Sequence, residues 1–550
     1  NPASNTWQQV AAEGSPTGKC SFGMVYVPSS KEIITYGGQS LATVLGETTD
    51  YKAATNRWVQ RATTANVPPS DRRGNAMVEI TNTNDLFLFG GYTWDIPLVD
   101  GVPDPDSPEL VMLNETWTFA EENLRWTEVD LPSGGPGPIA DHQMVYTQRA
   151  DPLDNRVILF GGRTTVPPEA GSENGGPFGQ GYQGSTWAYN PAEIASERWK
   201  EVLEDGQGPT ARIGHAMAYS TAQNKVVLYG GQIGDRYLAD DYPNDTWFYD
   251  VAEAQWTDIT GSVGAPPSAR SFAKMVYMPD LDKFLLVGGV YVDPSGGDGP
   301  PGGPPGGGGD GEGESASYSV NAETWTFDLQ TQTWTQLTPA NSPTAVFAQY
   351  MAYNPKRGRV LMYGGNIEEN EVINQTWEYD PIGNDWERVK PLKSGGPRGN
   401  GAMAWDSHNN TMNVFGGAQF EASFDDHWVL VPGEATHTLA VSTEQILLPD
   451  DTAIQGIKAI WRAGAPSTGW LPASETTNGA SLFAWDTTLG WRLVATNSEP
   501  STIPGYVQWS SNDANDVRRL SAETNTTLNF MVRPTSGKES KESYLVSDYA

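Results

Sequence analysis

The stretch Val226-Val227-Leu228-Tyr229-Gly230-Gly231 decides the fold, because the 550-residue sequence repeats its pattern seven times. Each copy has four mostly apolar, β-branched or aromatic residues followed by two glycines. The other six copies begin at Ile33, Leu86, Val157, Phe284, Val360 and Met412. Such runs are typical of buried strands. A glycine pair permits positive φ and close approach of neighbouring backbone. The recurrence therefore predicts a repeat architecture.

Each run lies inside a larger module that predicts four strands. A strand of small residues such as Gly214-His215-Ala216-Met217 precedes the run by about ten residues. A Thr-Trp strand follows it, at Thr116, Thr186, Thr246, Thr324 and Thr376. A second tryptophan marks a fourth strand, at Trp58, Trp126, Trp199, Trp256, Trp334 and Trp386. Four strands with aromatic residues between modules are typical of a β-propeller blade.

These modules resemble the kelch repeat, in which an apolar run ending in Gly-Gly precedes a Tyr or Phe and a Trp at set offsets. The resemblance covers roughly residues 5–432 and implies a seven-bladed propeller. The first blade departs from the pattern, with Tyr51 interpreted as standing where the others carry Thr-Trp. The first-glycine spacings are longer than those of a minimal kelch blade.

The two ends of the repeat region predict how the ring closes. The seventh module has a third strand, 427–430, but no tryptophan strand after it. The missing strand is found at the start of the chain, where residues 5–10 include Trp7. We expect this segment to complete blade seven, because closure removes an exposed strand edge. The first domain is therefore predicted to span residues 1–433.

Residues 434–550 no longer follow the kelch pattern and resemble no family that we can name. Short strand-like segments recur there, at 438–441, 456–461, 481–485, 491–494, 506–509, 528–532 and 544–546. This spacing predicts a small β-sandwich. We expect it to serve in attachment, in packing against the propeller or in self-association. The predicted fold class is all-β, with a closed seven-bladed propeller followed by this sandwich.

Composition limits the partners. The net charge is −33, from 67 acidic and 34 basic residues. Such a surface repels phosphate backbones and anionic lipids, so neither nucleic-acid binding nor membrane insertion is expected. Cys20 is the single cysteine, which excludes a disulfide framework within the chain. The chain starts at Asn1, which fits removal of a signal peptide or an engineered start, and we expect an extracellular or cell-surface protein.

Insertions and arginines together suggest a binding face. The long segments after the second strands, 92–113, 163–185, 232–244 and 290–322, should share one face of the ring. Pro-x-x-Arg turns precede the innermost strands, so their arginines should approach the channel mouth and could clamp a carboxylate or sulfate. The structural alternative is that each arginine pairs with an aspartate or carbonyl of the adjacent blade. The candidate ligand-binding residues are Arg73, Arg212, Arg270, Arg398, Trp94, Tyr182 and Tyr237.

Acidic residues in two of these segments are candidates for calcium binding, since hard cations prefer carboxylate oxygens. These candidate calcium ligands are Asp95, Asp100, Asp104, Asp106, Asp235, Asp240 and Asp241. The alternative is a solvated acidic surface, and no other cofactor is predicted. His427 beside Asp425 and Asp426 is the one histidine cluster that resembles a metal site, but a structural role is favoured for it. His142 and His215 occupy equivalent positions in two blades and are also interpreted as structural.

The resulting hypothesis is a non-enzymatic recognition or adhesion protein that binds a glycan or protein through the loop-rich propeller face. One alternative is a structural subunit of a surface layer or extracellular filament. The second is a carbohydrate-active enzyme, although no spacing singles out a catalytic carboxylate pair. Fold alone does not decide between them.

Overall fold

The computed structural model describes the chain in segments and in two compact units. The described residues are 6–10, 14–41, 43–61, 68–81, 83–95, 98–99, 102–103, 109–120, 125–130, 134–148, 152–165, 180–234, 241–292, 318–368, 371–389, 394–419, 422–431, 457–462, 480–486, 490–497, 506–511, 529–534 and 544–545. One unit comprises Trp7–Asp380 and Asn384–Val431. The other comprises Asn1–Thr6, Pro381–Gly383 and Pro432–Ala550.

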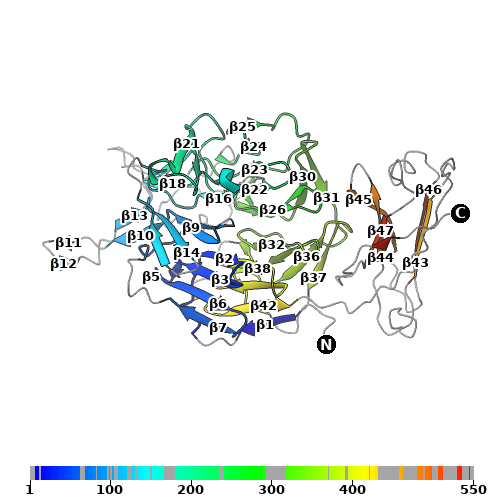
Figure 1. The fold of residues 1–550 in the computed structure, drawn as a ribbon, viewed down its shortest axis with the longest axis horizontal. Coiled ribbons are helices and arrows are strands. Elements are labelled where there is room, and N and C mark those ends of the chain that lie inside the picture. Colours follow the sequence, from blue (N-terminus) through cyan, green and yellow to red (C-terminus); the bar gives the residue numbers. More distant parts are fainter. Residues whose placement is uncertain are drawn as a thin grey trace. The chain divides into compact units, whose positions relative to one another are not determined.

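The first unit is a ring of seven four-stranded antiparallel sheets (Figure 1). Blade 1 contains β2 (Gly23–Val27), β3 (Glu32–Tyr36), β6 (Thr48–Lys52) and β7 (Arg57–Gln60). Blade 2 contains β8 (Ala76–Ile80), β9 (Asp85–Phe89), β14 (Thr116–Ala120) and β15 (Arg125–Glu128). Blade 3 contains β16 (Gln143–Tyr146), β17 (Val157–Phe160), β20 (Thr186–Tyr189) and β21 (Trp199–Leu203).

The remaining blades follow the same order from the channel outwards. Blade 4 contains β22 (Ala216–Ser220), β23 (Lys225–Tyr229), β24 (Thr246–Asp250) and β25 (Gln255–Asp258). Blade 5 contains β26 (Lys274–Met278), β27 (Lys283–Val287), β30 (Thr324–Asp328) and β31 (Thr333–Leu337). Blade 6 contains β32 (Tyr350–Asn354), β33 (Arg359–Tyr363), β36 (Thr376–Asp380) and β37 (Asp385–Val389).

Blade 7 closes the ring with the N-terminal strand, as predicted. Its sheet order is β1 (Thr6–Val10), β42 (His427–Val431), β39 (Thr411–Phe415) and β38 (Ala402–Asp406). Trp7 of β1 is buried and donates its indole N–H to Thr376 Oγ1 of blade 6 at 2.8 Å. Its ring also packs against Tyr363. The first strand is therefore held both by the sheet and by the neighbouring blade.

A tryptophan–threonine hydrogen bond joins most neighbouring blades. The fourth-strand tryptophan donates to the threonine that opens the third strand of the preceding blade, at 2.7–3.0 Å in six junctions. In blade 1 this threonine is Thr48, which accepts from Trp126. Thr48 and Thr49 therefore stand in the Thr-Trp position, and Tyr51 pairs with Trp58 as Phe119 does with Trp126. The strand register shows that the interpretation of Tyr51 as the replacement for Thr-Trp was wrong.

The glycine pairs connect each blade to the next. The second glycine of every pair has φ between 97° and 115°. Its N–H donates to the carbonyl of the residue that enters the following blade, at 2.8–3.0 Å in all seven junctions. A side chain at the first glycine would collide with that same carbonyl oxygen, and one at the second glycine would collide with the backbone that enters its own blade, which is why the pair recurs.

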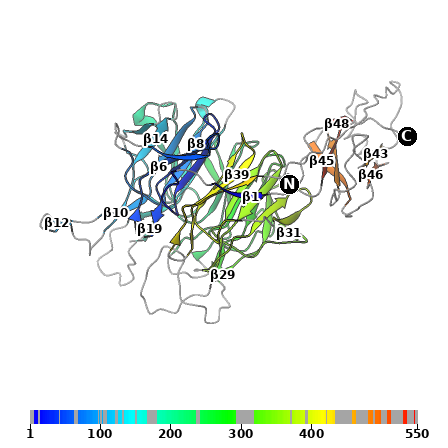
Figure 2. The same ribbon diagram turned by 90° about the horizontal axis from the view of Figure 1, so that it is seen from below.

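Short ribbons extend the connection after the second strand in six blades. They are β4–β5 (Gln39–Ser40 and Thr43–Val44), β10–β13 (Tyr92–Asp95 and Glu109–Met112), β18–β19 (Arg163–Thr165 and Gln180–Tyr182), β28–β29 (Val290–Val292 and Tyr318–Val320), β34–β35 (Asn366–Glu368 and Glu371–Val372) and β40–β41 (Ala418–Gln419 and Ala422–Ser423). A further ribbon, β11–β12 (Leu98–Val99 and Val102–Pro103), extends the second of these. Figure 2 shows β10, β12, β19 and β29 on the same side of the propeller.

The C-terminal region contains two antiparallel sheets. One pairs β43 (Ile457–Arg462) with β46 (Tyr506–Ser511). The other has the order β45 (Gly490–Asn497), β44 (Ala480–Asp486), β47 (Asn529–Pro534) and β48 (Tyr544–Leu545). These strands overlap six of the seven predicted segments, and 438–441 lies outside the described residues. Among the described residues, no helix is long and apolar enough to cross a membrane.

Candidate binding site at the channel mouth

A belt of seven residues surrounds one end of the central channel. Each residue lies two positions before an innermost strand and has φ between 49° and 65°. The seven are Ser21, Gly74, Asp141, Gly214, Phe272, Ala348 and Asn400. In six of the seven steps around the ring, the N–H donates to the belt carbonyl of the preceding blade. The described residues give Gly214 N–H no such partner on Asp141, so the belt is open between blades 3 and 4.

Two further residues of each blade lie beside the belt. The residue before each belt position forms an isolated β-bridge with the residue that follows the glycine pair, such as Arg73 with Tyr92 and Ala140 with Arg163. The same bridge occurs in all seven blades. The fold thus presents three side-chain positions per blade at the mouth and leaves their chemistry to the local sequence.

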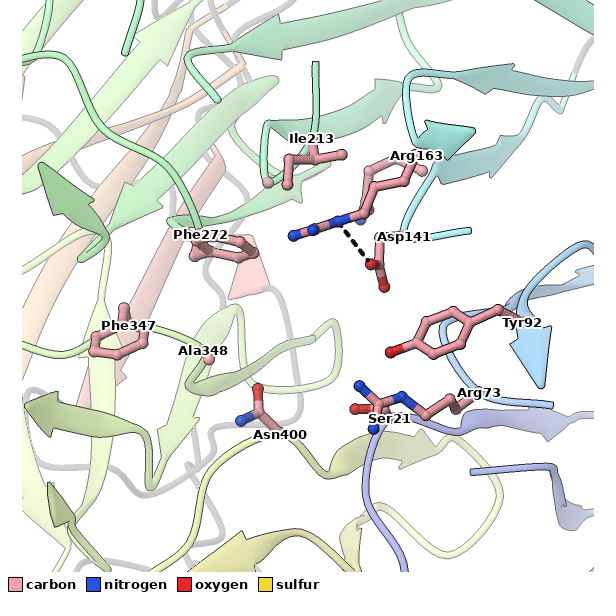
Figure 3. Close-up of a pocket in the computed structure, with 12 residues that line it drawn as sticks. Ser21, Arg73, Tyr92, Asp141, Arg163, Ile213, Phe272, Phe347, Ala348 and Asn400 are labelled. Atoms are coloured by element: carbon pink, nitrogen blue, oxygen red, sulfur yellow. Dashed lines mark ion pairs between the residues drawn. The ribbon is translucent and has the colours of Figure 1, made fainter. Parts of the chain in front are cut away.

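A cavity of about 190 Å³ opens at this mouth. Most of its side chains form a polar edge and an apolar edge, and Figure 3 shows Phe272 and Phe347 across the opening from Tyr92 and Arg73. The polar edge carries Arg73, Tyr92, Asp141 and Arg163 from blades 2 and 3. The apolar edge consists of Ile213, Phe272, Phe347 and Ala348 from blades 4 to 6. At roughly 30 Å³ per water molecule, the cavity holds about six waters or one small chemical group.

The polar edge carries more positive than negative charge. Arg163 Nε lies 3.3 Å from Asp141 Oδ2, and both side chains are partly exposed. Arg73 stacks on Tyr92, with its Cζ 4.7 Å from the ring centroid. Burial, reinforced by the nearby Asp141 carboxylate, raises the pKa of Tyr92 to about 12, so its hydroxyl stays protonated. Two guanidinium groups and one carboxylate leave an excess of one positive charge beside a hydrogen-bond donor.

Arg212, Arg270 and Arg398 lie elsewhere, although they were expected at the mouth. All three are almost completely buried. Arg212 binds Asp245 through both terminal nitrogens, at 2.6 and 2.7 Å, and donates to the Gly230 carbonyl at 2.9 Å. Arg398 repeats this arrangement with Asp426 and the Gly416 carbonyl, whereas Arg270 donates through Nη2 to Glu323 and through Nη1 to the Gly288 carbonyl. Their interpretation as a ligand-binding ring is corrected, because the protein already occupies these guanidinium groups.

The alternative expectation, that each arginine pairs with an acidic residue or a carbonyl, fits these arginines, but the position of the partners differs from the expected one. The carboxylate and carbonyl partners belong to the blade that the arginine enters, whereas the arginine's own carbonyl accepts from the glycine of the blade before it. Arg72 occupies the equivalent position in blade 2, where it pairs with Glu115. Although burial alone would raise the pKa of Glu115, the Arg72 charge and three hydrogen bonds lower it. The main chain and side chain of one residue therefore join two blades.

Arg73 is the predicted arginine that does line the cavity. It follows Arg72, so it stands one residue beyond the position of Arg212, Arg270 and Arg398. The spacing signals this difference, because the Pro-x-x-Arg pattern counted from Pro69 ends at Arg72. In the described residues, Arg73 Nε has no hydrogen-bond partner.

Comparison with known proteins agrees with this architecture. Residues 1–167 match the family model described as the KLHDC2/KLHL20/DRC7 Kelch-repeats domain. The match covers the first two blades and the start of the third, and all seven four-stranded blades are joined through the same kind of glycine pair. The propeller is a kelch-repeat propeller. The expected resemblance is thereby confirmed.

Curated relatives share parts of the kelch propeller. Mei4-dependent protein 6 of Schizosaccharomyces pombe is 25% identical over 232 residues, which are 40% of this chain and 30% of that protein. Acyl-CoA-binding domain-containing protein 5 of Arabidopsis thaliana is 25% identical over 300 residues, 53% of this chain and 40% of that protein. Kelch domain-containing protein 10 of Bos taurus is 26% identical over 192 residues, 35% of this chain and 36% of that protein. The matches span well under half of each relative.

The predicted aromatic residues differ in position. Trp94 lies on β10, two residues beyond Tyr92 and on the same face of the ribbon, with 37% of its surface exposed. Tyr182 ends β19 opposite Arg163 and is partly buried. Tyr237 lies outside the described residues. Trp94 and Tyr182 therefore sit on ribbons that begin at Tyr92 and Arg163 of the kelch mouth.

Most predicted calcium ligands cannot be placed. Six of the seven predicted ligands have side chains outside the described part of the structure, namely Asp95, Asp100, Asp104, Asp106, Asp235 and Asp240. Asp241 is buried, and its carbonyl accepts from Ile233 N–H. Within the described part of the chain, no group of three or more His, Cys, Asp or Glu side chains is placed to hold a metal ion. Calcium binding stays a prediction.

Three histidines are packed between blades of the kelch propeller. His142 and His215 are edge-on to Phe89 and Phe160 of the preceding blades. His427 stands in the threonine position of blade 7, where its Nε2 lies 3.0 Å from Asn413 Oδ1. Burial lowers the pKa of each of the three to about 3, which keeps the rings neutral. Their interpretation as structural residues fits these surroundings.

Sequence reasoning missed Tyr92, Asp141, Arg163, Phe272 and Phe347. Two of them directly follow a glycine pair, and the others lie two or three positions before an innermost strand. A position-by-position alignment of the seven modules would have found both sets, since the bridge between them recurs in every blade. The charged residues among them, Asp141 and Arg163, both belong to blade 3.

Proposed function

We propose that this chain is a recognition module whose kelch propeller binds a ligand at the channel mouth. An acidic group of a protein or glycan ligand lies between Arg73 and Arg163, while an adjoining apolar group contacts Phe272 and Phe347. The observation that carries this proposal is the pair of guanidinium groups on adjacent blades, facing a cavity and accompanied by one carboxylate. Guanidinium groups bind carboxylates and sulfates through directed hydrogen bonds.

Size and shape support a terminal or side group as the part of the ligand that enters. The cavity of about 190 Å³ is smaller than the roughly 300–1,000 Å³ of pockets that enclose whole drug-sized ligands. The rest of the ligand would lie on the ribbons around the mouth, where Trp94 is exposed. Kelch propellers generally bind proteins, which favours a protein ligand over a glycan.

The extracellular or cell-surface setting is part of the proposal. The net charge of −33 supports it, since strong acidity keeps a protein soluble and discourages binding to nucleic acid. Local positive charge at the mouth then contrasts with the acidic remainder and would attract an anionic group. Recognition or adhesion is the role that fits this arrangement, with no catalysis assigned.

The test compares the full chain with Arg73→Gln and Arg163→Gln variants on an array of acidic peptides, polygalacturonate and heparin. We expect each substitution to weaken binding of the best probe by about tenfold, since a charge-assisted hydrogen bond contributes roughly 1.5–3 kcal/mol. Arg156→Gln removes one charge away from the mouth, at an arginine that interacts with Leu153 and Asp154, and should leave binding unchanged. Equal binding by all variants would exclude the mouth.

Absence of parental binding to every probe would contradict the recognition module. Sedimentation velocity over a range of concentrations would then test the structural-subunit alternative. Concentration-dependent assembly would support that alternative.

A further inference from the structure

Three blades carry an asparagine two residues before the third strand, at the mouth end of that strand. These residues are Asn114 in blade 2, Asn244 in blade 4 and Asn374 in blade 6, and all three are exposed. Each is followed by a residue other than proline and then by threonine, so each begins an Asn-x-Thr motif. This motif is the acceptor for N-linked oligosaccharides on the surface of secreted proteins.

The packing of the ring explains the second and third residues of each motif. The threonine is buried and accepts the indole N–H of the junction tryptophan, at 2.8–2.9 Å. The middle residues Glu115 and Asp245 pair with the buried arginines that enter their blades. Gln375 accepts the indole N–H of the tryptophan two residues later, at 2.9 Å. Blade construction therefore accounts for both of these positions without any role for the asparagine.

The fold does not require asparagine at the first position. Among the described residues, the side chains of Asn114 and Asn244 have no hydrogen-bond partner. Asn374 has only long contacts, at 3.3 and 3.4 Å, with the loop that leads to blade 7. The equivalent residues of the other four blades share no chemistry with one another and are Gly46, Gly184, Ala322 and Asp425.

Asn321 of blade 5 shows what a structural asparagine looks like in this region. It lies three residues before the third strand, one position earlier than the others, and it is buried. Its side-chain oxygen accepts from Glu323 N–H at 2.6 Å, and its amide nitrogen donates to Ser268 Oγ at 3.2 Å. The exposed asparagines of blades 2, 4 and 6 lack such an arrangement among the described residues, so their amide groups remain available for modification.

We propose that Asn114, Asn244 and Asn374 are N-glycosylation sites, which place oligosaccharides on alternate blades at the mouth side of the kelch propeller. The inference rests on the extracellular setting of the proposed function. The side-chain amide nitrogen attacks the anomeric carbon of an oligosaccharide carried on a lipid diphosphate. A C–N bond forms, the lipid diphosphate leaves with the electrons of the broken C–O bond, and the nitrogen loses one proton. Transfer before folding finds the threonine accessible, and the exposed asparagine then accommodates the sugar in the finished blade.

The test expresses the full chain behind a secretory leader in human cells and recovers it from both the cells and the medium. Peptide N-glycosidase F in heavy-oxygen water converts each occupied asparagine to labelled aspartate, which peptide mass spectrometry detects. We expect most copies to be occupied at all three sites. Asn114→Gln, Asn244→Gln and Asn374→Gln should each remove one oligosaccharide from the intact mass. The same chain expressed without the leader should carry no sugar.

Chain made in bacteria separates glycosylation from a structural role. Without sugar, the three variants should melt at the parental temperature, whereas Asn321→Gln should melt roughly 2 °C lower, because it loses buried hydrogen bonds. Unoccupied sites in the chain that carries the leader would overturn the proposal. So would a loss of stability in the three variants equal to that of Asn321→Gln. Neither result would decide ligand binding at the mouth, because the probe array can be applied to the chain without sugar.

Discussion

Arg72 and Arg73 are adjacent in the chain but belong to two regions with opposite demands. Arg72 is buried at a blade junction, where Glu115 and the Gly90 carbonyl bind its guanidinium group. Arg73 is at the mouth, stacked on Tyr92 and facing a cavity. At the junction, a carboxylate of the protein neutralises the arginine, whereas at the mouth the Arg73 guanidinium group faces the cavity and can meet a ligand. This contrast separates residues that hold the ring together from residues that can meet a ligand.

The junctions also show how charge is matched within the repeat. Wherever the residue entering a blade is basic, the residue before the third strand of that blade is acidic. The five pairs are Lys19–Glu47, Arg72–Glu115, Arg212–Asp245, Arg270–Glu323 and Arg398–Asp426. In blades 3 and 6 the entering residues are Ile139 and Val346, and the partner positions hold Ser185 and Gln375. A buried basic residue thus occurs where the same blade provides a carboxylate that pairs with it.

The largest expected effect comes from substituting a junction arginine. Arg212→Met should lower the free energy of unfolding by about 3 kcal/mol, because Asp245 and the Gly230 carbonyl lose a buried cationic partner. Arg73→Met should lower it by less than about 1 kcal/mol, the scale of an isolated cation–π contact. Urea unfolding followed by tryptophan fluorescence measures both. Equal losses would erase the distinction between junction and mouth.

Acidification should weaken the junctions through their neutral histidines. The pKa values of His142, His215 and His427 are lowered to about 3 in the folded chain, below the ordinary value of 6.5. As the pH falls below 6.5, the unfolded chain therefore binds more protons, and stability decreases down to about pH 3. Each histidine should contribute up to about 1.4 kcal/mol per pH unit.

A single variant sharpens this pH prediction. His142→Gln should flatten the pH dependence between pH 6.5 and 4.5, since glutamine is already present at the equivalent position, Gln349, in blade 6. Unfolding free energies at several pH values, measured for parent and variant, give the difference in slope. An unchanged slope would mean that His142 titrates normally in the folded protein.

The smallest expected effect compares two tryptophans in equivalent junctions. Trp256 donates to Thr186 Oγ1 at 2.7 Å, whereas Trp58 meets His427 instead of a threonine, and its indole N–H has no partner among the described residues. Trp256→Phe should therefore cost about 1 kcal/mol more than Trp58→Phe, the value of one buried hydrogen bond. Thermal unfolding of both variants tests this difference. A larger loss in Trp58→Phe would contradict the assigned pairing.

Sequence alone determined the number of blades, their four-stranded construction and the closure by Trp7. These features depend on local signals that repeat, namely buried strand runs, glycine pairs and tryptophans at fixed spacing, so each copy supports the others. The face that carries the extensions also followed from strand order. The assignment of Tyr51 failed because register depends on which residues pair across the sheet.

Tertiary structure decided which side chains reach the mouth. A shift of one residue separates Arg72 from Arg73, and the positive φ at Gly74 turns the chain directly after them. Arg73, Arg163 and Phe347 come together from separate blades only because the ring brings these positions to one end of the channel. The sequence supplied the charges, but burial and ring geometry decided which of them are neutralised and which remain available to a ligand.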